Sequence, residues 1–178
     1  MKHASKIMTA EAFGAVAAAG LSAAPASAAA PAHAETIVAD PHGHEEYGSD
    51  LGEIWNCVWA VGPIDCGTAK GAATDAENAT VEEVNAGVFD YDSMHNGKAD
   101  AFRHCYWNAL MVDRIDYEQA EAVATAHEEK PGQPFEEKLM DLENNHFGRN
   151  IGAATPSEQA ARDSCRYHAV QGSLKTLK

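Results

Sequence analysis

The chain has 178 residues and a formal net charge of −14, with 27 acidic and 13 basic residues. A chain of this length builds one domain of ordinary size and leaves little room for a second. Its acidic surface repels nucleic acids and anionic lipid headgroups at long range, which argues against an extended nucleic-acid interface but leaves room for a small basic pocket.

Residues 1–34 have the pattern of a secretory signal peptide. Lys2 and Lys6 precede an uncharged run at 12–24 that is rich in alanine and glycine, and small residues follow it. The run is shorter than the ~20 residues that a bilayer requires, so a retained membrane anchor is the weaker interpretation. We therefore expect a secreted, extracellular protein without a membrane span. Two A-x-A cleavage motifs are present, at 26–28 and 32–34.

Residues 35–50 combine proline, glycine and charged residues with little periodic hydrophobicity, which predicts a flexible N-terminal arm. From residue 51 onward the pattern is helical almost throughout, and no strand-like alternation of useful length occurs. We therefore expect residues 51–178 to form a single all-α domain of five or six short helices.

The first predicted helix carries an apolar stripe that we expect to be buried, because its members recur at i, i+3, i+4, i+7 and i+8. Gly62 and Pro63 should break this helix, and a second helix should run from Pro63 to about residue 84. The residues of the stripe are Leu51, Ile54, Trp55, Val58 and Trp59.

After a loop at 86–97, further helices are expected at about 99–113, 117–129, 135–150 and 156–171. We expect the third of these to end near Gly148 or Gly152. The last should begin with Thr155 as its capping residue and Pro156 at its first helical position, because TPSE has the form of a capping box.

The chain has four cysteines and no C-x-x-C pair, which in an exported protein favours two disulfides over a metal site. Three connectivities are open. We favour Cys57–Cys66, which would close a short local turn, and Cys105–Cys165, which would tie the central helix to the last one. The longer link would contribute roughly 3–4 kcal/mol through loop closure. Four buried free thiols are the alternative.

The predicted helix at 99–113 carries an unusual polar stripe. Asp100, His104 and Asn108 lie four residues apart and therefore share one face, with Trp107 beside it. The remaining positions are apolar enough for the helix to be packed nearly all round, so the His104 imidazole should be buried and needs hydrogen-bond partners.

The next two helices repeat this feature. His127 ends an apolar stripe and should point inward, whereas Glu128 should lie at the rim. Asp141 and Asn145 share one face of the later helix, and the adjacent asparagine pair is a poor helix former that asks for compensating contacts. The other face of that helix is apolar and consists of Phe135, Leu139 and Leu142.

Imidazoles, carboxylates, amides and guanidinium groups are the components of acid–base or metal-assisted hydrolytic sites. We therefore predict that the three helices meet in one polar pocket. The catalytic candidates are His104 and His127 as acid–base groups or metal ligands, and Glu128 and Asp141 as base or orienting carboxylates. The substrate-binding or pocket residues are Asp100, Arg103, Trp107, Asn108, Asn144, Asn145 and Arg149.

A divalent metal such as zinc is a candidate cofactor. In a zinc site, His104, His127 and one carboxylate would bind the ion and leave a fourth position for water. The sequence lacks the H-E-x-x-H spacing, so neither the presence nor the identity of a metal follows from it. It also lacks a phosphate-binding P-loop and a G-x-S-x-G nucleophile elbow.

Three ordered motifs resemble an uncharacterised bacterial domain. They are NGKADAFRHCYWNAL at 96–110, AHE at 126–128 and MDLENNHFGRNIG at 140–152, which match R-H-x-x-W, H-E and D-x-x-N-N-x-x-G-R signatures. The domain looks like one found in small exported actinobacterial proteins and at the C-terminal tips of polymorphic toxins. The resemblance covers roughly residues 51–178 and implies, by association only, a compact catalytic module.

Two functions fit these observations. The first is a secreted hydrolase-like or toxin-like enzyme, whose substrate outside the cell is a lipid, a phosphodiester or a cell-wall component and whose partner could be an immunity or target protein. The second is a non-enzymatic secreted binding or inhibitor module, in which the polar motifs only build the fold. Replacement of His104 and His127 by alanine separates them.

Overall fold

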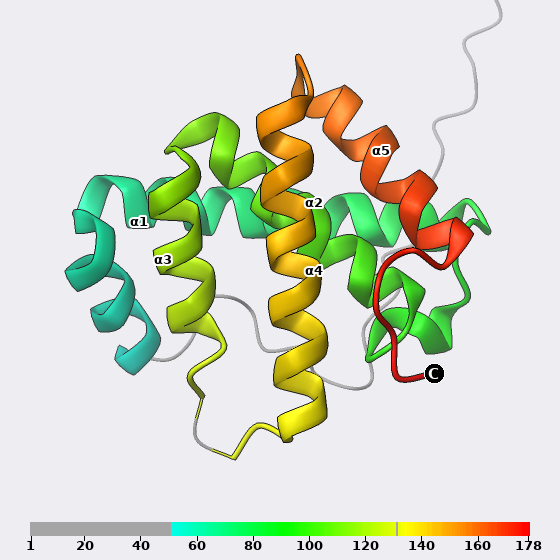
Figure 1. Ribbon diagram of the computed structural model, residues 1–178, viewed down its shortest axis with the longest axis horizontal. Helices are drawn as coiled ribbons and strands as arrows, with labels where there is room; N and C mark the ends of the chain where they lie inside the picture. The colour runs from blue at the N-terminus through cyan, green and yellow to red at the C-terminus, as the bar shows by residue number, and fades with distance from the viewer. Residues whose placement is uncertain (1–50, 131) are drawn as a thin grey trace, which may run out of the picture. The chain divides into compact units, whose positions relative to one another are not determined.

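The computed structural model describes residues 51–130 and 132–178, and these residues belong to one structural unit of the chain, residues 36–178. They are helical and contain no strand, which confirms the predicted all-α class (Figure 1). The predicted signal peptide at 1–34 and arm at 35–50 lie outside the described residues. The elements are α1 (Leu51–Asn85), η1 (Tyr91–Met94), α2 (Lys98–Arg114), α3 (Tyr117–His127), α4 (Phe135–Ala154) and α5 (Glu158–Gln171).

Helix α1 bends at the predicted break. Gly62 has φ 85° and ψ 167°, a left-handed backbone conformation that a side chain would strain, and Pro63 lacks the N–H that would continue the helical hydrogen bonds. The two limbs on either side of Gly62 therefore run in different directions (Figure 1). Within the described part of the chain, no helix is both long and apolar enough to cross a bilayer.

Helix α2 is the centre of the domain. It packs against α1, α3, α4, α5 and η1, and Figure 1 shows it passing behind α4. Every residue from 99 to 111 is buried except Arg103. This confirms the prediction that the helix is packed nearly all round, and it explains why apolar and polar side chains alternate along it: each face meets a different neighbour.

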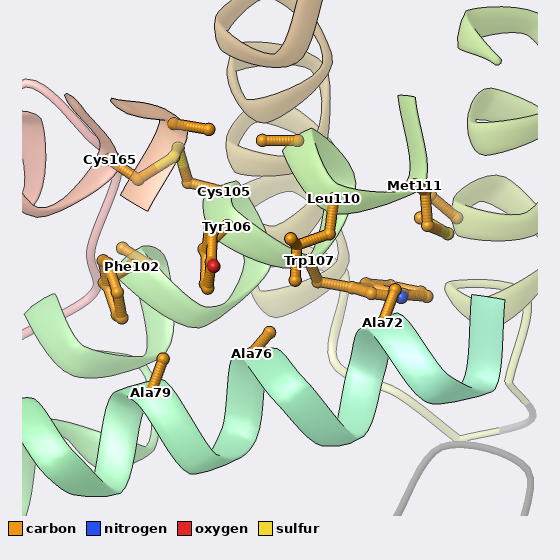
Figure 2. Close-up of a cluster of buried hydrophobic side chains, with 14 of the residues drawn as sticks. Ala72, Ala76, Ala79, Phe102, Cys105, Tyr106, Trp107, Leu110, Met111 and Cys165 are labelled. Carbon is orange, nitrogen blue, oxygen red and sulfur yellow. A yellow bond between two sulfur atoms is a disulfide. The ribbon is translucent and has the colours of Figure 1, made fainter. Parts of the chain in front are cut away.

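The contact between α1 and α2 is apolar and pairs small residues with large ones. Methyl groups on α1 leave room for rings on α2, so the two helices approach closely. The indole Nε1 of Trp107 donates a hydrogen bond to the carbonyl oxygen of Ala69 at 3.2 Å, which satisfies its buried polar atom. Figure 2 shows Ala72, Ala76 and Ala79 of α1 beside Phe102, Tyr106 and Trp107 of α2.

The contact between α2 and α4 depends on two glycines that we expected near the end of α4. Helix α4 ends at Ala154, which confirms an end near Gly152 and places both glycines inside the helix. A Cβ atom at Gly148 would lie 2.1 Å from the carbonyl oxygen of Cys105, and one at Gly152 would lie 2.7 Å from that of Ala109. Glycine is required at these positions because backbone meets backbone across the interface.

Both predicted disulfides are present. Cys57–Cys66 joins the two limbs of α1 across the bend, with Cα atoms 5.6 Å apart. Cys105–Cys165 joins α2 to α5, with Cα atoms 5.8 Å apart (Figure 2). Because Cys105 also lies against Gly148, this second link and the close helix contact meet at one point of α2.

The apolar stripe at the start of α1 is not buried as predicted. Trp59 is 82% exposed, Trp55 62% and Ile54 37%, while Val58 is half-buried. The side chain of Leu51 lies outside the described residues. This limb turns Cys57 and Glu53 inward instead, because the neighbour it meets is α3, at the polar residue His127.

The start of α5 also differs from the prediction. Ser157, and not Thr155, is its capping residue: the Ser157 hydroxyl accepts a hydrogen bond from the backbone N–H of Ala160. Thr155 instead caps the end of α4, since its backbone N–H donates to the carbonyl oxygen of Ile151. At the other end, α5 stops at Gln171 as expected, with Gly172 in the left-handed conformation that ends helices.

Candidate functional site

Helix α4 buries its polar face and exposes part of its apolar face. Phe135 is 70% exposed and Leu139 36%, and Leu142 is half-buried, so the predicted apolar face lies largely toward solvent. The face that packs inward carries the polar residues of the D-x-x-N-N-x-x-G-R motif. Its buried residues are Met140, Asp141, Asn144, Asn145, Gly148 and Arg149.

The imidazole of His104 is the centre of this polar interior and is only 4% exposed. Its Nε2 lies 3.4 Å from Nη2 of Arg103, and its Nδ1 lies 3.1 Å from Oδ1 of Asn145. Because a guanidinium has only donors, Nε2 must accept, and the ring proton is therefore assigned to Nδ1, which donates to Asn145. The Nε2 lone pair therefore faces the guanidinium of Arg103, at a donor–acceptor distance of 3.4 Å that is long for a hydrogen bond.

A chain of amides holds this tautomer in place. Arg149 Nη1 donates to Oδ1 of Asn108 at 3.1 Å, and Nδ2 of Asn108 donates to Oδ1 of Asn145 at 2.7 Å. Nδ2 of Asn145 in turn donates to Oε1 of Glu128 at 2.9 Å. Since each amide is oriented by the next, Asn145 presents an oxygen to His104, which explains the need for adjacent polar residues on a buried helix face.

Carboxylates surround the imidazole. On the Nε2 side, Oδ1 of Asp141 lies at 3.5 Å and Oδ1 of Asp100 at 3.6 Å. On the Nδ1 side, Oε1 of Glu128 lies at 3.7 Å. No hydrogen-bond donor in the described part of the chain reaches the buried Oδ1 of Asp141. Asp100, His104 and Asp141 each offer a ligand atom, and these three atoms lie within 4.8 Å of one another.

This environment shifts the pKa values of Asp100, His104 and Asp141 in different directions. Burial opposes the ionisation of Asp100, but the charge of Arg103 and the hydrogen bond from the backbone of Asn96 outweigh it and lower the pKa of Asp100. Burial and the nearby Arg103 lower the pKa of His104, so the ring is neutral at pH 7. Burial, followed by the negative charges of Glu128 and Asp100, raises the pKa of Asp141 to about 9.

Arg103 lies between this interior and the solvent. Its side chain is 22% exposed, and it donates to Oδ1 of Asp100 while Nε lies 3.5 Å from Oε2 of Glu77. Burial alone would lower the pKa of Arg103. The negative charges of Asp100 and Glu77 raise it by more than burial lowers it, so the guanidinium stays charged. A permanent positive charge therefore stands at the edge of the cluster, next to Nε2 of His104.

The two imidazoles come close but do not share the carboxylates. The His104 and His127 ring centroids are 6.4 Å apart, and His127 packs edge-on against Trp107 with centroids 5.1 Å apart. His127 is buried as predicted, and its Nδ1 pairs with Oε1 of Glu53 from α1. The ligand atoms that converge therefore come from His104, Asp100 and Asp141, and not from the two histidines of the zinc site imagined from the sequence.

Glu128 is buried, although we expected it at the rim. It is 1% exposed because it follows the last residue of α3 and turns inward, where its carboxylate accepts hydrogen bonds from Asn145 and from Gln133.

Asn144 lies apart from the other residues of the predicted pocket. Its amide bonds both the N–H and the C=O of Lys175 and so fastens the C-terminal segment to α4.

Two contributors to the cluster were not among the predicted site residues. Gln133 donates to Oε2 of Glu128 at 3.0 Å and to Oδ2 of Asp141 at 3.3 Å. The backbone N–H of Asn96 donates to Oδ2 of Asp100 at 2.7 Å. Asn96 has φ 61° and precedes Gly97, so its turn was readable from the sequence, but nothing around Gln133 distinguished it from an ordinary loop residue.

The fold and this cluster define a class: a disulfide-bonded, all-helical domain that buries a histidine among carboxylates, amides and guanidinium groups. The chain belongs to the family described as a domain of unknown function (DUF6973), which matches residues 58–176. This range contains the whole cluster around His104 and lies within the region whose motifs resembled an uncharacterised domain. No solved structure matches the chain.

Proposed function

We propose that this domain is a secreted hydrolase whose reaction centre is the cluster of Asp100, His104 and Asp141. The observation that carries the proposal is the orientation of His104: amides fix Nδ1 as the donor, and the Nε2 lone pair faces Asp141 and Asp100. Nε2 has only a long contact of 3.4 Å with Arg103, and beside it lies an oxygen of Asp141 that no donor among the described residues reaches, so these two atoms can accept a further group.

The chemistry that these atoms support is the activation of water. A nucleophilic water needs acceptors that orient it and take up positive charge as its proton leaves. Nε2 of the neutral His104 ring is such an acceptor once its long contact with Arg103 opens, and Asp141, which a pKa of about 9 keeps protonated at pH 7, lies beside it to orient the water. Glu128 and Asn145 act as positioning residues, because they hold the ring from the Nδ1 side.

The class of substrate follows from Arg103. A guanidinium next to the reacting nitrogen and partly open to solvent suits an anionic group such as a phosphate. This favours a phospholipid or another phosphodiester over an uncharged cell-wall component. The net charge of −14 disfavours a long nucleic acid as that substrate. A toxin-like role, with an immunity or target protein as partner, is compatible with such an activity.

Export is supported by the two disulfides, since such links persist mainly in oxidising compartments. The competing proposal is a non-enzymatic secreted binding or inhibitor module. It is favoured by one observation, the burial of the cluster: Asp100, His104 and Asp141 are each at most 4% exposed. In that case the network would serve to align three helices.

Substitution of His104 by glutamine distinguishes the two functions. The full chain with both disulfides formed is tested on a soluble phosphodiester, on phospholipid vesicles and on peptidoglycan fragments. We expect the wild type to hydrolyse one of the first two, and His104→Gln to lower kcat/KM by about 100-fold or more, because it removes the basic nitrogen. The matched control is His146→Gln, which replaces an exposed histidine of α4.

The proposal fails if the wild type hydrolyses none of the three substrates, or if His104→Gln retains the wild-type rate. Far-UV circular dichroism and thermal unfolding of both variants accompany the assay. A His104→Gln protein that loses activity but keeps its helicity supports the enzyme. If the wild type is inactive and His104→Gln unfolds, the network is structural.

A further inference from the structure

The cluster holds more buried negative charge than positive charge. Asp100, Glu128 and Asp141 are 3%, 1% and 4% exposed, and the cation that bonds directly to one of them is Arg103. Unpaired buried charges are costly, so a chain that retains three carboxylates here needs a further positive charge when all are ionised.

The place for that charge is marked by two acceptors that face each other. No donor among the described residues reaches Oδ1 of Asp141, which lies 3.5 Å from Nε2 of His104, and Nε2 has only a long contact of 3.4 Å with Nη2 of Arg103. This separation is longer than the 2.7–3.2 Å that is usual for a hydrogen bond, so a proton between the two atoms is a poor bridge. Oδ1 of Asp100 lies 3.6 Å from the same nitrogen.

A metal ion fits this spacing. Bonds of about 2.0–2.1 Å to tetrahedral zinc place neighbouring ligand atoms about 3.4 Å apart. The observed separations of 3.5 and 3.6 Å are close to that ligand-to-ligand distance, and all three ligand atoms lie within 4.8 Å of one another. One imidazole nitrogen with two carboxylate oxygens is a donor set that zinc accepts.

The surroundings of His104 have the form usual for a metal-binding histidine. Such residues donate their second ring N–H to an oxygen, which fixes the tautomer and strengthens the bond to the ion. Nδ1 of His104 donates to Oδ1 of Asn145, and Asn145 is itself held by Asn108 and Glu128. The amide chain of α2 and α4 is thus an outer layer that presents Nε2 to a cation.

We propose that Nε2 of His104 and the Oδ1 atoms of Asp100 and Asp141 form a binding site for one zinc ion. Two positive charges from the ion and one from Arg103 balance the three buried carboxylates. Three protein ligands leave a fourth position for water, and zinc supplies the acidity that makes such a water nucleophilic near pH 7. The role of the ion in hydrolysis rests on the proposed function, but its binding does not.

Zinc binding by the full chain, stripped of metal with a chelator, tests the site. We expect calorimetry to detect a zinc site whose affinity falls by about 100-fold or more in Asp141→Asn, because a direct ligand is removed. His104→Gln should lose the same site. The matched control is Asp113→Asn, an exposed position of α2, which should bind as the wild type does. All proteins retain the histidines of residues 1–50, so binding there is common to every sample.

Thermal unfolding separates loss of a ligand from loss of the fold. Zinc should raise the melting temperature of the wild type and of Asp113→Asn, because it binds only the folded chain, and leave that of Asp141→Asn unchanged. In the absence of zinc, Asp141→Asn should melt at the wild-type temperature or above it, since it removes a carboxyl group whose ionisation is opposed by burial. Equal zinc affinity in the wild type, Asp141→Asn and His104→Gln overturns the site, as does a wild type that binds no zinc.

The outcomes for the site and for the enzyme are distinct. Zinc binding that is lost in both ligand variants, together with no hydrolysis of any substrate, supports the metal site and removes the proposed function. Hydrolysis that persists in chelator-treated protein but is lost in His104→Gln supports the function and overturns the zinc site.

Discussion

The two sides of α2 show two different ways to fill a protein interior. Toward α1 the helix presents Phe102, Tyr106 and Trp107, which pack against methyl groups (Figure 2). Toward α4 it presents polar side chains, and there the backbones meet at Gly148. Both sides are buried to the same degree, but one is held by contact area and the other by individually oriented hydrogen bonds.

The two interfaces of α2 contribute differently to stability. An apolar interface stabilises the fold in proportion to the area removed from water and tolerates changes that preserve volume. A buried polar network is at best weakly stabilising, and it fails when a single partner is lost. A chain that keeps aspartates, asparagines and a histidine at its centre therefore forgoes stability there, which is the pattern expected of a site with a chemical task.

The largest effect is expected on the apolar side. Phe102→Ala removes a ring that is fully buried and packs 5.5 Å from Phe89, and it should lower the free energy of unfolding by about 3–5 kcal/mol. Urea unfolding measures the change. Phe135→Ala, at a position 70% exposed, is the control and should stay within about 0.5 kcal/mol of the wild type. Similar losses in both variants would contradict the described packing.

Gly148→Ala should break the polar side by forcing α4 away from α2. The new Cβ would lie 2.1 Å from the carbonyl oxygen of Cys105, and we expect a loss of about 3 kcal/mol, together with loss of any activity. The control is Gly67→Ala in α1, where nothing lies within 4 Å and alanine should raise stability by about 0.5–1 kcal/mol through helix propensity. Chemical denaturation measures the free energy of unfolding of both variants. A Gly148→Ala protein as stable as the wild type would refute the close contact.

Asn145→Ala sharpens the comparison by removing one oriented amide. It removes the hydrogen-bond partner of Nδ1 of His104 and of Oε1 of Glu128, and it leaves Nδ2 of Asn108 with its bond to the carbonyl oxygen of His104, so we expect a loss of about 2 kcal/mol. Asn78→Ala, at an exposed position of α1, should change stability by less than about 0.5 kcal/mol. The network would not be cooperative if the two variants unfolded at the same denaturant concentration.

The smallest effect has the opposite sign. In metal-free protein at pH 7, Asp141→Asn should raise the free energy of unfolding by about 1 kcal/mol, because Asp141, with a pKa raised to about 9, must take up a proton on folding and an amide need not. Asp100→Asn should instead destabilise the protein, since Asp100 accepts from Arg103 and from the backbone of Asn96. Thermal melts of the two variants should therefore shift in opposite directions, and shifts in the same direction would refute this assignment.

The helices, the disulfides and the part of the site that lies on α2 could be predicted from local sequence patterns. The helix expected at 99–113 is Lys98–Arg114, and both disulfides pair as expected. Asp100, His104 and Asn108 share a buried face because a spacing of four residues places side chains together on any helix. These features depend only on residues close in sequence or on the pairing of a few cysteines.

The errors have a common physical origin. Trp55, Trp59 and Phe135 lie on apolar stripes and are nevertheless exposed, and in α4 it is the face of Asp141 and Asn145, predicted to line a pocket, that is buried. Periodicity identifies the two faces of a helix, but it does not say which face finds a neighbour. Gly148 likewise looks like a helix end until the opposing backbone of Cys105 is known.

The sequence by itself determined an all-helical, disulfide-linked chain with a histidine and an aspartate on one face of its central helix, because these properties are local. Only the tertiary structure decided that Asp141 joins them, that Gln133 bridges two carboxylates and that His127 turns to Glu53 instead. These contacts join different helices and loops, and Asp141 reaches His104 because glycines let α4 lie directly against α2.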